Sequence, residues 1–467
     1  MSKIVKREQD FAKWYTSIVL EADLVDYGLA KGTMIFKPYG WQIWNLIKQE
    51  FTKKLEEVGT EECCLPLMIP YSEFIKEKKH IEGFNPELYK VSFIGDKKLE
   101  DELVIRPTSE IAFCHYFQKN VSSYNTLPMI LNQWCNVFRV EKNTRPFLRT
   151  CEFFWQEQHA VFASEKEAQE FSLKMLNVYE NFVKDYLSIA LLSGEKTENE
   201  RFAGAKNTYT IEAIMPDGQA LQSGTSHYLG TNFSKNFDIK FQDKDNSYKY
   251  VYQTSAGIST RIMGAIIMSH SDNEGLVLPF KIAPIQFAIV ASNQIEKNVI
   301  NNIAQELKEY RTKVQIVEKS IGLTLQKNEI MGIPFQVIIG KKELETNTVT
   351  IYNRAYKTKI QININEFENK VVELIKQYEN ELYNKSLNNM KNSIVEIDNF
   401  EDFKKQINNK KVVLCYWNGT VEDEKKIKEL TGATARCFPL NSKPEANKKC
   451  FYTNKESARL IYFARAY

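Results

Sequence analysis

The densest group of chemically active side chains lies in residues 137–162. Arg139 and Glu141 fall on one face of a predicted strand, and a polar connection follows them. In the returning strand, alternate positions share a face, and these are Arg149, Cys151, Phe153, Trp155, Glu157 and His159. A guanidinium there suits a phosphate or carboxylate, and an aromatic ring can stack on a purine or cover an aliphatic ring. The alternative is an antiparallel hairpin with a charged rim.

Two more polar clusters flank this hairpin in the sequence. In residues 106–110, Thr108 or Ser109 can cap a following helix whose first turn holds Glu110, and capping alone would explain that segment. Residues 222–228 place small hydrogen-bonding side chains around one of only 5 histidines in the chain. The members of interest there are Gln222, Thr225 and His227.

The fourth cluster runs from Ser255 to Arg261. Gly257 permits a tight turn, and Arg261 then enters an otherwise apolar helix, where an arginine is costly unless it is paired. Its partner is either a phosphate or a structural carboxylate. The sequence has no Gly-x-x-x-x-Gly-Lys-Ser/Thr loop and no Gly-x-Gly-x-x-Gly after a strand. If ATP binds, arginines on an antiparallel sheet must hold it.

Three blocks of predicted elements position these clusters. The first, to about residue 281, contains an amphipathic helix at 41–58, strands at 136–140 and 147–162, a helix at 165–192, and a strand that turns into a helix at 255–269. In the second block, strands alternate with helices, which predicts a small α/β domain with a mostly parallel sheet. A polar stretch at 384–392 is predicted to be a linker, and a short α+β block follows it.

Composition sets limits on partners and compartment. The 467 residues suit two or three domains, and 43% are hydrophobic, which supports a buried core. The formal charge of +3 means that any nucleic acid must be bound by local basic patches. Residues 1–10 show no secretory signal, and no apolar run could span a membrane. The 8 cysteines form no Cys-x-x-Cys pair, which favours reduced thiols in the cytosol.

Taken together, the clusters resemble a class II aminoacyl-tRNA synthetase. The arginine-bearing hairpin resembles motif 2, and residues 257–261 with the following helix resemble motif 3. The helix at 41–58, with Gly59 and the strand ending at Pro66, resembles the dimer-forming motif 1. More narrowly, segments along the whole chain resemble prolyl-tRNA synthetases of the archaeal and eukaryotic type: 106–110, 145–150, 153–157, 222–232 and 463–467.

The resemblance implies an architecture and an activity. It implies an α+β catalytic domain built on an antiparallel sheet, an α/β anticodon-binding domain and a small α+β C-terminal domain, at 1–282, 283–388 and 389–467. The enzyme would activate L-proline with ATP to prolyl-adenylate and pyrophosphate. It would then transfer proline to the 3′ end of tRNA(Pro), in the cytoplasm and as a homodimer.

The resemblance also implies roles for single residues. Arg139 would be catalytic, contacting both the proline carboxylate and the ATP α-phosphate. The other proline-binding residues would be Thr108, Glu110, Trp155, His227 and Ser255. The other ATP-binding residues would be Glu141, Arg149, Phe153, Gln222, Thr225 and Arg261. Mg²⁺ would bridge the phosphates of ATP.

The chain departs from this family pattern at a zinc site. The family often carries four cysteines in the C-terminal domain, whereas three of those positions here hold Asn418, Asp423 and Thr453. Tetrahedral zinc needs four soft or imidazole ligands, and Cys450 alone cannot hold it. We therefore expect no structural zinc and no protein ligand set for a metal.

Other departures affect specificity. Ala256 stands where the family usually has tryptophan, and residues 320–325 differ enough that no anticodon-reading residue is assigned. Only about 60 residues separate the hairpin from Gln222, too few for an editing domain on the order of 100 residues. The terminus at Tyr467 is expected to reach back toward the active site, and the alternative is a surface tail that tolerates extension.

Two other functions compete with this interpretation. One is a synthetase for threonine, serine or glycine built on the same core. Glu110 with His227, and Trp155, favour a ring and a secondary amine instead. The other is a synthetase-like regulator or scaffold without catalysis, which the retained arginines argue against.

Overall fold

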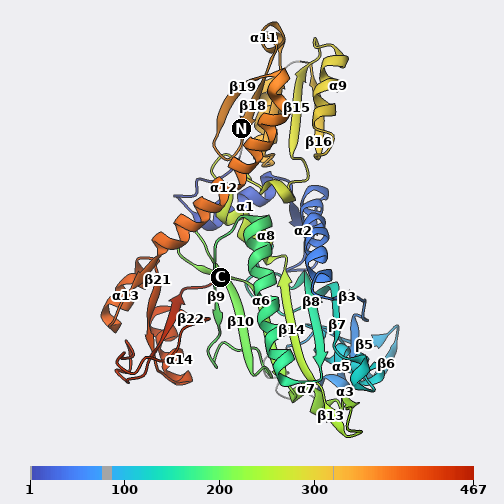
Figure 1. Cartoon of the computed structure of the whole chain (residues 1–467), viewed down its shortest axis with the longest axis vertical. Helices are drawn as coiled ribbons and strands as arrows, with labels where there is room; N and C mark the ends of the chain where they lie inside the picture. Colours follow the sequence, from blue (N-terminus) through green and yellow to red (C-terminus); the bar gives the residue numbers. More distant parts are fainter. Residues whose placement is uncertain (1–2, 76–86, 319) are drawn as a thin grey trace.

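The chain folds around one large sheet. The computed structural model describes residues 3–75, 87–318 and 320–467. An 11-stranded sheet has the order β20-β21-β23-β22-β9-β10-β11-β14-β8-β7-β3 (Figure 1). Its strands, in that order, are Ile394–Glu396, Val412–Trp417, Arg459–Ala464, Thr434–Pro439, Leu191–Glu195, Asn207–Ile214, Ala220–Gly230, Tyr252–Ser259, Glu152–Phe162, Met129–Phe138 and Glu61–Glu62. The run from β9 to β7 is antiparallel throughout.

Helices cover one face of this sheet, where α6 and α8 lie across the central strands (Figure 1). A capping box formed by Ser164 and Glu167 starts α6, which ends before the predicted residue 192 because Ser188 adopts a left-handed conformation. Phe51 packs against α6, with its ring 4.7 Å from that of Phe182. The helices on this side are α1 (Phe11–Glu21), α2 (Pro38–Glu56), α6 (Glu165–Leu187) and α8 (Arg261–His270).

Smaller elements complete the first unit. A three-stranded antiparallel sheet has the order β4-β6-β5, and two hairpins pair β1 with β2 and β12 with β13. The strands are β1 (Val25–Tyr27), β2 (Met34–Phe36), β4 (Met68–Pro70), β5 (Lys90–Ile94), β6 (Lys97–Ile105), β12 (Lys240–Gln242) and β13 (Tyr248–Tyr250). The helices are α3 (Tyr71–Ile75), α5 (Glu110–Asn120) and α7 (Asn232–Asn236), with 3₁₀ turns at Tyr124–Thr126 and Phe280–Ile282; a third 3₁₀ turn, Ile364–Glu366, lies in the second unit.

The second unit is a five-stranded sheet with the order β16-β15-β17-β18-β19. Its elements are β15 (Phe287–Ser292), α9 (Lys297–Glu306), β16 (Thr312–Val317), α10 (Ile321–Ile330), β17 (Phe335–Ile339), α11 (Lys341–Glu345), β18 (Thr348–Asn353) and β19 (Thr358–Asn363). Only β15, β16 and β17 are parallel; β18 and β19 add antiparallel pairs. The expected mostly parallel sheet is wrong because the connections at 340–347 and 354–357 are too short for a crossover.

The predicted linker at 384–392 is also wrong, because α12 (Phe367–Ser393) runs through it. Asparagine favours a non-helical backbone, but packing overrides this preference. The hydroxyl of Ser386 accepts a hydrogen bond from the backbone N–H of Ala190 at 3.0 Å, and the Asn389 amide donates to the carbonyl of Ile214 at 2.9 Å. This helix connects the second unit to the third (Figure 1).

The third unit extends the central sheet instead of standing apart from it. Strands β20 to β23 pack with α13 (Phe400–Asn408) and α14 (Val421–Thr431). Strand β22 pairs with β9 of the first unit, Phe438 with Glu195 and Pro439 with Gly194. Gly194 is required there, because a Cβ would lie 2.2 Å from the Phe438 carbonyl oxygen. The expected fold class is thus confirmed. None of the helices in the described residues is long and apolar enough to cross a membrane.

Candidate active site

A cavity of about 500 Å³ opens on the central sheet. Its walls come from β8, β10, β11 and β14, from the first residue of α8, and from the connections around them. All twelve residues singled out in the sequence line it: Thr108, Glu110, Arg139, Glu141, Arg149, Phe153, Trp155, Gln222, Thr225, His227, Ser255 and Arg261. The structure therefore brings together four segments that are far apart in the chain.

The hairpin differs from its prediction. Residues 139–151 form a connection between β7 and β8 instead of continuing the two strands, and Phe147 turns the chain with φ of 60°. Arg149 reaches the cavity from this connection. Cys151 does not line the cavity, because it packs on Gly32, where a Cβ would come within 2.4 Å of the cysteine sulfur. The prediction that alternate residues share one face is confirmed from Phe153 onward, where they line the cavity, and is wrong for Cys151.

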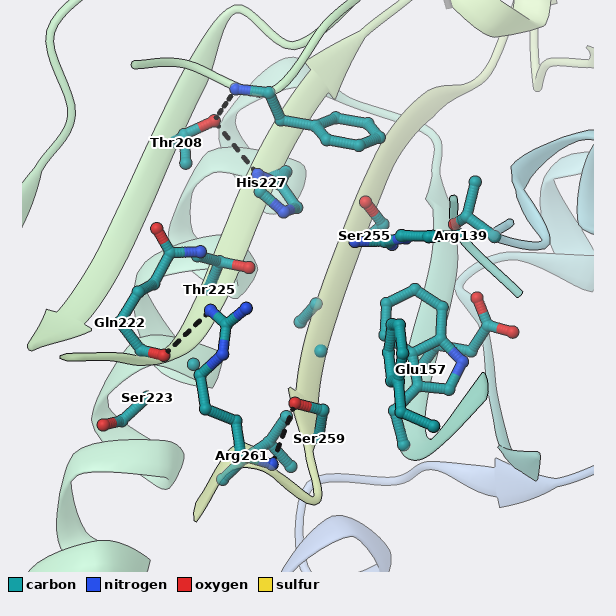
Figure 2. A pocket seen from close by; sticks show the side chains of 18 of the residues that line it. Arg139, Glu157, Thr208, Gln222, Ser223, Thr225, His227, Ser255, Ser259 and Arg261 are labelled. Atoms are coloured by element: carbon teal, nitrogen blue, oxygen red, sulfur yellow. Dashed lines mark hydrogen bonds between the residues drawn. The ribbon is translucent and has the colours of Figure 1, made fainter. Parts of the chain in front are cut away.

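One end of the cavity combines a carboxylate with a neutral imidazole. Glu110, at the start of α5, is buried and accepts a hydrogen bond from the Thr108 hydroxyl. Nδ1 of His227 lies 3.0 Å from Oγ1 of Thr208 (Figure 2). Burial, reinforced by His159, lowers the pKa of His227 to about 3. The imidazole is uncharged at neutral pH, so this end favours a positively charged ligand group.

A buried carboxylate supports the same end. Glu157 accepts hydrogen bonds from the Ser109 hydroxyl, from Ser109 N–H at 3.2 Å and from Gln133 Nε2 at 2.6 Å, and lies 3.3 Å from His159. Burial acts to raise the pKa of Glu157, but the hydrogen bonds and His159 outweigh it, and the pKa is lowered. The capping expectation was wrong, because neither Thr108 nor Ser109 caps α5 through its side chain; both hold pocket carboxylates.

Arg139 lines the cavity beside two aromatic rings. Its Nε donates to the Pro107 carbonyl at 3.0 Å, and its guanidinium lies 5.2 Å from the ring of Phe153 and 5.3 Å from that of Trp155. Burial lowers the pKa of Arg139. Figure 2 shows it on the opposite side of Ser255 from His227. The buried hydroxyl of Ser255 has no hydrogen-bond partner among the described residues, so it is free for a ligand.

The other end of the cavity is positively charged. Arg149 lies 3.8 Å from the Glu141 carboxylate. The Arg261 guanidinium donates to two neutral carbonyl oxygens, that of Leu148 at 3.1 Å and that of Gln222 at 3.4 Å, and Figure 2 shows the bond to Gln222. Burial, with the charges of Arg149 and Arg139, lowers the pKa of Arg261 to about 10. Among the described residues no carboxylate forms an ion pair with Arg261, so the structural-carboxylate alternative does not hold and an anionic ligand is favoured.

One segment of the wall was missed in the sequence. The connection between β9 and β10 contributes residues 199–203 to the cavity. The Phe202 ring lies 4.6 Å from that of His227, and its N–H donates to the Thr208 hydroxyl at 3.0 Å. The available signal was a lone phenylalanine after a charged run, Glu198 to Arg201, in a segment without secondary-structure periodicity.

Comparisons with known proteins agree with this arrangement. Three family models match: "tRNA synthetase class II core domain (G, H, P, S and T)" at 89–270, "Anticodon binding domain" at 283–374 and "Prolyl-tRNA synthetase, C-terminal" at 400–467. The chain is 64% identical to a proline–tRNA ligase of Malacoplasma penetrans over 100% of both chains. It is 47% identical to one of Mycoplasma mycoides, over 100% of this chain and 99% of that protein.

A solved structure shows the same fold. Prolyl-tRNA synthetase from Cryptosporidium parvum, complexed with halofuginone and AMPPNP, superposes with a TM-score of 0.94 at 33% identity, covering 99% of each chain. Full-length identity to curated relatives, three matching domain models and the shared fold lead to one conclusion: the chain belongs to the prolyl-tRNA synthetase family, in class II of the aminoacyl-tRNA synthetases.

Proposed function

We propose that the chain is a proline–tRNA ligase that uses ATP. The observation that carries this proposal is the polarity of the cavity. A buried carboxylate and a neutral imidazole, Glu110 and His227, lie at one end, and guanidiniums, Arg149 and Arg261, lie at the other. The charge of Arg139 interacts with those of both Glu110 and Arg261. This order matches an amino acid laid head to tail against a nucleoside triphosphate.

Proline would lie at the carboxylate end. Its secondary ammonium has two N–H groups, which would donate hydrogen bonds to oxygens of Glu110 and Thr108, while the uncharged His227 adds no repulsion. Trp155 would cover the proline ring. Its indole lines the cavity beside Gly257, where an added Cβ would lie 3.5 Å from the indole. The unpartnered hydroxyl of Ser255 would complete the contacts.

The arginines would align the reaction. Arg139 would bind both the proline carboxylate and the α-phosphate, which places the nucleophile opposite the pyrophosphate leaving group. Arg149 and Arg261 would stabilise the charge of the outgoing phosphates, and Phe153 would stack on adenine. The remaining ATP contacts would come from Glu141, Gln222 and Thr225. Proline's carboxylate is the nucleophile itself, so no general base is needed.

A magnesium ion fits the residues present. Mg²⁺ usually keeps several waters and takes one or two carboxylates together with substrate phosphates. Glu141 lines the arginine end of the cavity and supplies such a carboxylate. When bound, the ion would neutralise phosphate charge. The described residues contain no group of three or more His, Cys, Asp or Glu side chains that could hold a metal without ATP.

The other finer features are also proposals. We assign residues 1–282 to catalysis, 283–388 to anticodon binding and 389–467 to the C-terminal domain, supported by the separate apolar cores and the matched families. The motif 1 resemblance supports a homodimer, and sedimentation as a monomer at micromolar concentration would contradict it. The segments ending at Tyr467 support the archaeal and eukaryotic type. A role in charging tRNA(Pro) supports a cytoplasmic location for the enzyme.

We also propose that the chain lacks a cis-editing domain. Residues 163–221 are occupied by α6, β9 and β10 with their connections. Alanine differs from proline by ring methylenes, and each such group gives only about 1–3 kcal/mol of discrimination. Measurable alanine activation without hydrolysis of Ala-tRNA(Pro) is expected. Rapid deacylation of that species by this chain alone would disprove it.

ATP–pyrophosphate exchange with each amino acid tests the central proposal. Proline-dependent exchange supports it. Exchange that depends on threonine, serine or glycine would reassign the substrate, and no exchange with any amino acid would indicate a non-catalytic protein. Arg261→Gln serves as the site variant: it keeps a polar side chain but removes the charge, and should reduce exchange by about a hundredfold or more.

A further inference from the structure

The connection between β9 and β10, residues 196–206, lies between the cavity and the third unit, which we call the C-terminal unit. Its inner part forms the cavity wall beside His227. Its outer part contacts α14, which belongs to the C-terminal unit. We call residues 196–206 the wall loop. Its two sides connect a domain remote in sequence to the proline end of the site.

Hydrogen bonds to Glu424 join the wall loop to α14. The Thr197 hydroxyl donates to Oε2 of Glu424 at 3.0 Å, across 227 positions of sequence. Both residues are buried, with exposed fractions of 5% and 7%. A glutamate is seldom this deeply buried. Glu422, two residues earlier on the same helix, is exposed.

The first residue of the wall loop is fixed independently. Lys196 Nζ lies 2.7 Å from Oε1 of Glu212, whose Oε2 lies 2.8 Å from Nη2 of Arg436 on β22. Burial acts to raise the pKa of Glu212, but Arg436 and Lys196 hold it at about 2, so the carboxylate stays charged. The ion pair of Lys196 thus fixes the start of the wall loop, and the hydrogen bond from Thr197 to Glu424 fixes the next residue.

The inner part of the wall loop reaches the site through Phe202. Its N–H and the His227 imidazole both lie 3.0 Å from the Thr208 hydroxyl, so one atom connects loop and histidine. The phenyl and imidazole rings also pack together at 4.6 Å. A displacement of residues 197–202 would therefore move Phe202 away from His227.

We propose that Glu424 of the C-terminal unit is a positioning residue for the amino-acid site, acting through Thr197 and the wall loop on Phe202 and His227. The inference rests on the proposed function, because it presumes that proline lies beside His227. It gives the C-terminal unit a part in amino-acid binding, beyond the packing that holds it to the sheet.

The electrostatic cost of Glu424 supports this role. Burial raises the pKa of Glu424 to about 7, Glu200 adds to the rise, and hydrogen bonds from Thr197 and Asn199 with the charge of Lys196 oppose it. An apolar side chain would be easier to bury at this contact. The carboxylate is explained by the hydrogen bond that it accepts from the wall loop.

The test compares steady-state activation by Glu424→Ala, Glu424→Gln and the matched exposed variant Glu422→Ala. Glu424→Ala should raise KM for proline about tenfold, equivalent to about 1.4 kcal/mol, with KM for ATP changed less than twofold. Glu424→Gln keeps an oxygen acceptor for Thr197 and should restore KM for proline. Glu422→Ala should leave both constants unchanged.

A variant on the loop side protects the test against misfolding of the C-terminal unit. Thr197→Val keeps the shape of the side chain but removes the hydroxyl, and should raise KM for proline without adding to the effect of Glu424→Ala. Equal changes in KM for proline and ATP, or additive effects of the two variants, would overturn the inference. If the wild type shows proline-dependent exchange and the variants have the same KM for proline as the wild type, only the positioning role is disproved. If the wild type shows no proline-dependent exchange, the proposed function itself is disproved.

Discussion

The catalytic unit meets each of the two units that follow it through a buried arginine paired with a carboxylate. At the junction with the C-terminal unit, Arg436 binds Glu212. At the junction with the second unit, Arg354 forms two hydrogen bonds to Asp272, at 2.9 and 2.7 Å. Both arginine side chains are nearly or fully buried, so the chemistry at the two junctions is the same.

The surroundings of the two pairs differ. Glu212 and its second cation, Lys196, have side chains 0% and 1% exposed, within a sheet that continues through β9 and β22. Asp272 and its second cation, Lys357, are 19% and 42% exposed, beside a helix that connects the units. The C-terminal unit is therefore part of the same sheet as the catalytic unit, whereas the second unit is attached at the edge of the catalytic unit.

Replacing each arginine in turn tests whether the two junctions contribute differently to the free energy of unfolding. Arg436→Met leaves Glu212 and Lys196 buried with one partner fewer, and breaking such a pair costs about 3–5 kcal/mol of unfolding free energy. Arg354→Met leaves Asp272 partly in water and still facing Lys357 at 3.0 Å, so we expect about 1–2 kcal/mol. Urea unfolding followed by circular dichroism measures both.

Leucine in place of methionine at either position controls for side-chain shape. Equal losses at the two junctions, or a larger loss for Arg354→Met, would show that continuity of the sheet does not decide the cost. The proline dependence of exchange adds a second readout, since only Arg436 connects to the wall loop through Glu212 and Lys196.

The junctions also show what the sequence could and could not predict. Local patterns found the site residues, because arginines precede β8, aromatic and polar side chains alternate along it, and a helix begins at Glu110. The pairing of β22 with β9 joins Phe438 to Glu195 across more than 200 positions, and no local period encodes it. Phe202 was missed for the same reason: its role depends on His227, which only the folded sheet brings near.

Acid should weaken the second junction through His270. This histidine ends α8 two residues before Asp272, and its Nε2 lies 2.8 Å from the Leu187 carbonyl. Burial, opposed by the hydrogen bond to the Leu187 carbonyl and assisted by the Lys385 cation, lowers the pKa of His270 to about 4. The folded state then binds fewer protons than the unfolded state, so stability is complete above pH ~6.5 and is lost as pH falls toward 4.

The loss from His270 should approach about 3 kcal/mol. Unfolding free energies at pH 7.0 and 4.5 measure it, and His270→Asn should show a smaller drop than the wild type. The exposed His115→Asn is the matched control, because it removes a histidine from the surface instead of the interior. A drop of the same size in all three proteins would exclude His270 as the source.

Extension of the C-terminus should affect the first junction. The Tyr467 hydroxyl donates to Asp217 at 2.7 Å, its N–H donates to the Ala220 carbonyl at 3.2 Å, and its ring lies 5.7 Å from the Arg145 guanidinium. A tag added after Tyr467 should disturb the motif 2 connection and slow proline activation about tenfold, equivalent to about 1.4 kcal/mol. An N-terminal tag is the control; unchanged kinetics with both tags would support a tolerant surface tail.

The smallest effect is expected within the C-terminal unit, at positions that match the zinc site of the resembling family. Here the Asn418 amide donates to the Glu456 carbonyl at 2.6 Å, and the Thr453 hydroxyl donates to the Asn418 carbonyl at 3.2 Å. Hydrogen bonds thus connect the positions that a metal would join. Asn418→Ala should cost about 1 kcal/mol, and chelators should leave the unfolding midpoint unchanged. Stoichiometric, chelator-resistant zinc in the purified protein would contradict this, and would mean that the C-terminal unit depends on a metal and not only on its junction with the catalytic sheet.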